Sequence, residues 1–159
     1  MKQSIEIVAK KRNPTSRHLI LIIQMMTWDQ KFEVGHDRID AEHRIFFGLI
    51  VDFKEAQLAG APKDKLLRIL NEISKYAEFH FVSEENIMID FGYIELEEHQ
   101  KLHQQLLAEV LDKYYEFKHD MIHADGIFDF IFLWFALHTS REDKKLADCI
   151  KLDQAQIGN

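Results

Sequence analysis

The chain has 159 residues, a length typical of a single domain. Hydrophobic residues make up 47% of it and charged residues 30%, a balance that is typical of globular proteins and argues against disorder. The net charge of -7 argues against a dedicated nucleic-acid-binding protein, and the single cysteine excludes disulfide scaffolds, zinc fingers and cysteine-ligated clusters within one chain.

Residues 1–26 differ in composition from the rest of the chain. Residues 1–24 hold five basic residues and one acidic residue, a net charge of +4, which leaves -11 on the remainder. An apolar run of eight residues follows, from Leu19 to Met26. A signal peptide has the same order, but no small-residue cleavage site follows the run, and a membrane span needs about 20 apolar residues. We therefore expect a poorly ordered extension over residues 1–26, no membrane span and a cytoplasmic protein.

Four later segments place inward residues at intervals of three and four, the spacing of one face of an α-helix. The stripes run, in chain order, from Ile39 to Gln57, from Leu66 to Ile87, from Leu96 to Phe117 and from Ile127 to about Ile150. On the second segment the opposite face is charged and includes Glu85, which we expect in solvent. Four helices of about 20 residues with short loops favour an all-α, antiparallel up-down-up-down four-helix bundle. We assign residues 27–153 to this bundle and residues 154–159 to a C-terminal tail.

The fourth segment differs from the other three because it is apolar almost all round from Ile127 to Leu137. A helix of this kind is either deeply buried or in contact with another protein. The pattern therefore makes this helix the candidate surface for a partner protein or for a homo-oligomer.

A few polar residues interrupt the inward stripes, and the topology brings them together. They are His43, His80, Glu84, His99, His103 and His138. In an up-down bundle these positions all come to the same end, so they meet at one level of the core. A single buried histidine is usually a satisfied core residue, but five imidazoles and a carboxylate would be costly to bury unpaired. A bound metal gives each lone pair a partner, so the pattern predicts a metal site.

Asp143 is a further candidate ligand. It lies five residues after His138, about 140° around an ideal helix, so periodicity alone does not place it in the core. Glu142, at the i+4 position, competes with it on spacing. Asp143 reaches the core only with a long side-chain reach or a local π-bulge.

Taken together, these motifs closely resemble the bacterial branch of the hemerythrin family, over Thr27 to about Ile150. The matching motifs are Trp28 with Val34-Gly35; Ile39-Asp40-Ala41-Glu42-His43; His80-Phe81 with Glu84-Glu85 and Met88; His99-x3-His103; and Trp134-x3-His138-x4-Asp143. The family has Leu and Ile more often at the positions of Phe135 and Thr139, so Phe135 is a candidate lining residue of a ligand pocket.

The resemblance implies a non-heme centre of two iron ions (Fe2+/Fe3+, oxygen-bridged) that binds O2 reversibly. By position, one iron would be bound by His99, His103 and His138, and the other, with an open site for O2, by His43 and His80. Glu84 and Asp143 would bridge the two, which raises Asp143 above Glu142. We therefore expect an oxygen carrier, store or sensor rather than an enzyme. The alternatives are a di-iron redox enzyme (a peroxidase or a nitric-oxide-handling protein) and a metal-storage bundle.

Overall fold

The computed structural model describes residues 26–157. The extension predicted over residues 1–26 thus lies outside the described residues, apart from Met26, whose side chain is buried in the core. The last helix continues to Ile157, into the residues assigned to the tail, and residues 158–159 lie outside the description. The bundle boundaries assigned from the sequence stay predictions.

The described chain is helical throughout, without a strand between residues 26 and 157. In chain order its elements are a 3-10 helix Gln30–Phe32, α3 (Asp37–Leu58), α4 (Lys63–Asp90), α5 (Leu96–Lys118), α6 (Ala124–Leu137), a π-helical turn (His138–Glu142) and α7 (Asp143–Ile157). The last three elements are continuous in sequence and together form the predicted fourth helix.

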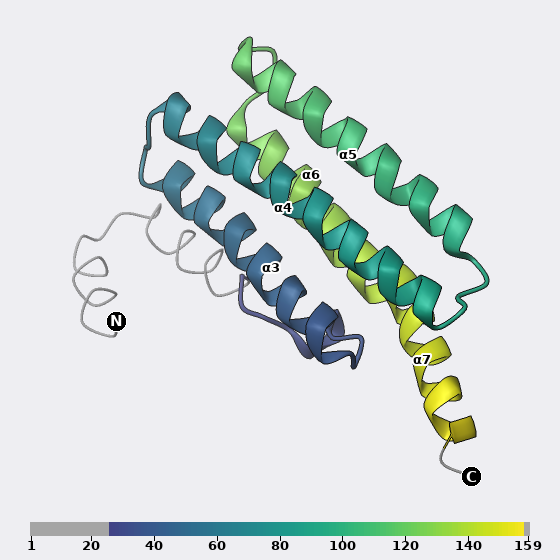
Figure 1. Ribbon diagram of the computed structural model, residues 1–159. Helices are drawn as coiled ribbons and strands as arrows, with labels where there is room; N and C mark the ends of the chain where they lie inside the picture. The colour runs from purple at the N-terminus through teal and green to yellow at the C-terminus, as the bar shows by residue number, and fades with distance from the viewer. Residues whose placement is uncertain (1–25, 158–159) are drawn as a thin grey trace, which may run out of the picture.

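The helices form the predicted four-helix bundle. Helices α3 and α5 each pack against both α4 and α6. Figure 1 shows α3, α4, α5 and α6 side by side along one axis, with α7 projecting past one end of the bundle. Because successive helices run in opposite directions, the start of α3, the end of α4, the start of α5 and the end of α6 lie at the same end. This arrangement is what brings the polar residues of the four stripes together.

Two of the connections are closed by glycines in the left-handed region. Gly60 follows the end of α3 with a φ of 70°, and Gly92 follows the end of α4 with a φ of 61°. Glycine is favoured at these positions because a Cβ atom is strained there. The loop before α3 is fixed differently, since the Asp40 carboxylate accepts hydrogen bonds from the backbone N–H groups of Val34 (2.6 Å) and Gly35 (3.0 Å).

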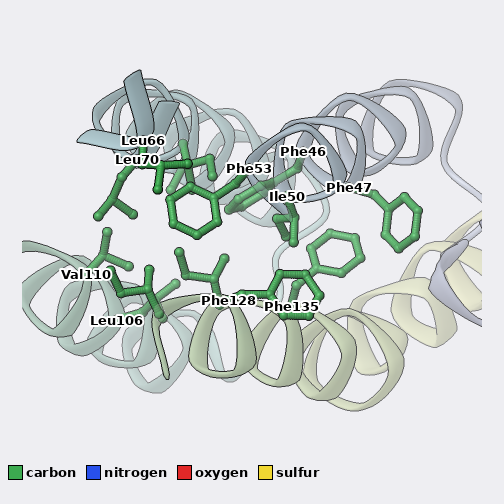
Figure 2. Packing of buried hydrophobic residues seen from close by; sticks show 14 of the residues in the cluster. Phe46, Phe47, Ile50, Phe53, Leu66, Leu70, Leu106, Val110, Phe128 and Phe135 are labelled. Atoms are coloured by element: carbon green, nitrogen blue, oxygen red, sulfur yellow. The ribbon is translucent and has the colours of Figure 1, made fainter. Parts of the chain in front are cut away.

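The apolar core has two parts with the polar residues between them. The larger part is rich in phenylalanine, and Figure 2 shows Phe46 and Phe53 of α3 facing Phe128 and Phe135 of α6 across the bundle interior. The smaller part lies toward the opposite end and is built from residues such as Ile39, Ile87, Met88, Leu146 and Ile150. In sequence, His43 lies between Ile39 and Phe46, so it separates the two apolar parts along α3.

Helix α6 is buried on one side only. Ile127, Ile131 and Phe135 are buried, whereas 59% of Leu133 and 40% of Leu137 are exposed. Of the helices within residues 26–157, none has the length and apolarity that a membrane crossing requires.

Candidate metal centre

All seven candidate ligands lie buried in one layer of the bundle. None is more than 5% exposed, and Glu84, Asp143 and His43 are fully enclosed. They come from every helix of the bundle, in chain order His43 of α3, His80 and Glu84 of α4, His99 and His103 of α5, His138 of the π-turn and Asp143 at the start of α7. The polar residues of the four stripes therefore lie at one level of the core, as the sequence predicts.

The first group of converging atoms joins α4, α5 and the π-turn. One ligand atom from each of Glu84, His99, His103 and His138 lies within 4.8 Å of the others. The Nε2 atoms of His103 and His138 are 3.1 Å apart. Glu84 Oε2 lies 3.3 Å from His103 Nε2 and 3.4 Å from His99 Nε2. Ligand atoms this close, from three separate elements, can surround a single ion.

The second group shares Glu84 with the first and adds His43 and Asp143. Asp143 Oδ2 lies 3.3 Å from His43 Nε2, and Asp143 Oδ1 lies 3.0 Å from His138 Nε2. The two carboxylates therefore touch both groups. His80 belongs to neither group, although its ring centroid is 4.9 Å from that of His43.

The polar atoms at the centre of this layer make no hydrogen bond within the described part of the chain. They are His43 Nε2, His99 Nε2, both oxygens of Glu84 and both oxygens of Asp143. Buried carboxylates and imidazoles in this condition are costly, because each has lost water without gaining a hydrogen bond in return. Metal coordination removes that cost, and imidazole with carboxylate is a ligand set that suits iron. The residues present therefore fit bound metal.

The protonation states of the metal-free site follow from these contacts. Burial and the charge of Asp143 act to raise the pKa of Glu84, but the imidazoles of His103 and His99 lower it. Burial acts to lower the pKa of His138, but the Asp143 carboxylate raises it. The net effect lowers the pKa of Glu84 to about 2, and although burial acts to raise the pKa of Asp143, His138 and His43 hold it well below its usual value, so both carboxylates are anionic at neutral pH. Burial acts to lower the pKa of His43 as well, but the Asp143 carboxylate raises it, so metal binding at His43 and His138 competes with protonation, since a coordinating nitrogen must be deprotonated.

A π-helical turn brings Asp143 into the layer. The wider turn over His138–Glu142 rotates less per residue than an α-helix does, so the residue five positions after His138 returns toward the same face and points inward. Thr139 Oγ1 donates to the Phe135 carbonyl at 2.8 Å inside this turn. Glu142, the competing candidate on spacing, pairs with Lys145 at 2.8 Å and is not in either group. Of the two residues that compete on spacing, Asp143 is the one whose side chain lies in the layer.

The outer nitrogen atoms of three rings are held by groups that sequence analysis gave no role. His43 Nδ1 donates to the Phe32 carbonyl at 2.9 Å. His80 Nδ1 lies 2.9 Å from Glu42 Oε2, and His103 Nδ1 lies 2.8 Å from Glu85 Oε1. These contacts point Nε2 of each ring inward. Glu85 was expected in solvent, but only 21% of its side chain is exposed because the carboxylate turns toward His103.

Aromatic rings enclose the layer. Phe81 stacks on His103 with ring centroids 3.9 Å apart, and Trp134 stacks on His138 at 4.6 Å. On the side of His43, the Phe135 ring is fully buried with its centroid 6.0 Å away. These rings exclude water and restrict the imidazoles to one orientation.

Comparison with known proteins gives one family and one fold. Residues 34–150 match the family model described as the hemerythrin HHE cation binding domain. A bacteriohemerythrin of Clostridium acetobutylicum is 29% identical over 130 residues, 78% of this chain and all of that protein. A myohemerythrin of Theromyzon tessulatum is 29% identical over 50% of this chain and 61% of its own. A crystal structure of wild-type hemerythrin, 23% identical, covers 77% of this chain and 95% of its own with a TM-score of 0.70.

Proposed function

The chain belongs to the hemerythrin family, and on this premise we propose that it binds O2 reversibly at a centre of two iron ions. The observation that carries the proposal is the set of buried imidazole nitrogens and carboxylate oxygens that converge without hydrogen-bond partners. Their number and their two overlapping groups suit a pair of ions rather than one. The bacteriohemerythrin and myohemerythrin relatives support the same choice.

We assign the seven side chains to the two ions as follows. His99, His103 and His138 would hold one iron, His43 and His80 would hold the other, and Glu84 and Asp143 would each supply oxygen atoms to both. The bridging role rests on the contacts of Glu84 and Asp143 with both groups of nitrogens. The ion with only two histidines has fewer protein ligands, so it is the one that offers a position to O2.

The surroundings of this position favour binding over further chemistry. The iron pair supplies the electrons and the coordination site that O2 requires. On the side of His43, the fully buried rings of Phe46 and Phe135 lie with centroids 5.6 Å apart. Phenylalanine rings have no proton to donate, and O–O cleavage needs protons. Five neutral imidazoles with two carboxylates also leave the centre electron-poor, which disfavours the oxidised states that oxygenases use.

Oxygen consumption separates this function from a redox enzyme. Protein loaded anaerobically with Fe2+ is expected to take up about one O2 per two irons and then stop. Uptake measured with an oxygen electrode should stay at that level when ascorbate or NADH is added as reductant. Consumption that continues for many equivalents would contradict the proposal and favour a peroxidase-like or oxidase-like role.

A further inference from the structure

Glu42 lies behind the one candidate ligand that stands outside both groups of converging atoms. Its Oε2 accepts the Nδ1 hydrogen bond of His80 at 2.9 Å. Its Oε1 accepts from Ser83 Oγ at 2.7 Å and from Arg38 Nε at 3.0 Å. Glu42 itself is 6% exposed. Both oxygens are therefore engaged, and the carboxylate cannot rotate without breaking at least one of these bonds.

This arrangement fixes the tautomer of His80. The Ser83 hydroxyl and the Arg38 guanidinium both donate to the Glu42 carboxylate, which favours an ionised acceptor that has no proton to give. The hydrogen in the bond must then lie on His80 Nδ1, which leaves the lone pair on Nε2. Glu42 also directly precedes His43 in α3, so one turn of that helix supplies both a ligand and the group that orients a second ligand on α4.

Glu85 has the same relation to the other half of the centre. Its Oε1 lies 2.8 Å from His103 Nδ1, and its Oε2 accepts from Gln100 Nε2 at 3.0 Å. Unlike Glu42, Glu85 keeps 21% of its side chain exposed. In each half of the centre, one histidine thus forms a hydrogen bond with a carboxylate outside the ligand layer. The Glu42 carboxylate is enclosed, whereas the Glu85 carboxylate is partly exposed to solvent.

We propose that Glu42 and Glu85 are positioning residues, each for a different ion: Glu42 acts through His80 and Glu85 acts through His103. Each carboxylate holds its imidazole with Nε2 toward the centre and makes that nitrogen a stronger electron donor. Such carboxylate–histidine pairs change metal affinity by about 10–100-fold. The inference rests on the proposed di-iron centre. It adds an assignment of each of the two outer carboxylates to the ligand of one particular ion.

Cobalt titration of single variants tests the inference without O2. Glu42→Gln keeps the size of the side chain and removes its charge. We expect it to weaken one of the two Co2+ equivalents by about 10–100-fold, measured by competition with a chelator and by the Co2+ absorption bands. Glu85→Gln should weaken one equivalent to a smaller extent, because solvent already contacts that carboxylate. The double variant should weaken the binding of both equivalents. Glu78→Gln is the control, since Glu78 lies on α4 like Glu85 but its side chain is 45% exposed, and this variant should weaken neither equivalent.

Two outcomes would overturn the inference. One is a Glu42→Gln variant that keeps wild-type affinity for both equivalents. The other is a variant in which both affinities fall equally together with the thermal stability of the metal-free protein, which indicates only a structural role. If Glu42→Gln does not fold, Ser83→Ala gives the same test, since it removes one bond that orients Glu42 and should weaken the same equivalent less. A wild-type protein that binds two Co2+ but, when loaded with Fe2+ instead, binds no O2 would contradict the proposed function and leave this inference intact.

Discussion

Replacing Asp143 with alanine is expected to abolish the binding of two irons per chain. The Asp143 carboxylate contacts His43 through one oxygen and His138 through the other, so its removal takes a ligand from both ions at once. It also leaves a buried cavity beside His43 and His138, which lose their nearest carboxylate. Iron per chain, measured after anaerobic loading and removal of free metal, should fall from two to one or fewer.

Glu142→Ala is the matched control for this experiment. Glu142 has the same charge and is the preceding residue, but it pairs with Lys145 outside the cluster. We expect this variant to keep two irons per chain. Loss of iron in Glu142→Ala with retention in Asp143→Ala would show that the π-turn does not set the ligand register.

Replacing Phe135 with alanine should destabilise the protein and shorten the life of its O2 complex. Phe135 is fully buried, and its ring packs against Phe32, Phe46 and Phe47 beside His43. Removing a buried phenylalanine ring costs about 3–5 kcal/mol. The space that it leaves adjoins the side of the centre assigned to O2, so water and O2 gain access. We expect oxidation of the O2-loaded protein to accelerate by about tenfold, which corresponds to about 1.4 kcal/mol in the barrier.

Phe53→Ala separates the two effects of this change. Phe53 is buried like Phe135, but it lies on α3. It follows His43 by ten residues, a distance of about 15 Å along the helix axis. Urea unfolding should show a similar loss of stability in both variants. Only Phe135→Ala should shorten the half-life of the O2-dependent absorption. Equal half-lives of the O2-dependent absorption in the two variants would mean that Phe135 does not limit access of water and O2 to the centre.

The sequence predicts the fold well because the bundle obeys a simple repeat. Alternation of three and four residues locates all four helices, and Gly60 and Gly92, which lie between consecutive stripes, adopt left-handed conformations after α3 and α4. Short loops then require antiparallel neighbours. The same reasoning places the polar residues of the stripes at one level, because in an antiparallel bundle the distance of a residue from its helix end determines its depth in the bundle.

Regular helical spacing is not sufficient where the helix is irregular. Asp143 lies in the layer because of a π-turn, and a period of 3.6 residues instead favours Glu142. Glu85 is missed for a related reason, since its long side chain reaches sideways to His103 from the flank of α4. A signal for Glu42 is present in the sequence, because it precedes His43 directly, but its contact with His80 depends on how α3 packs against α4.

Absorption spectra of a single iron-loaded sample test the central claim most directly. Spectra are recorded anaerobically after loading with two Fe2+ per chain, then in air, and then after flushing with argon. The account predicts a charge-transfer band that appears in air, fades under argon and returns on a second exposure to air. A band that never appears although two irons are bound, or one that converts irreversibly on first exposure, would contradict reversible O2 binding at this centre.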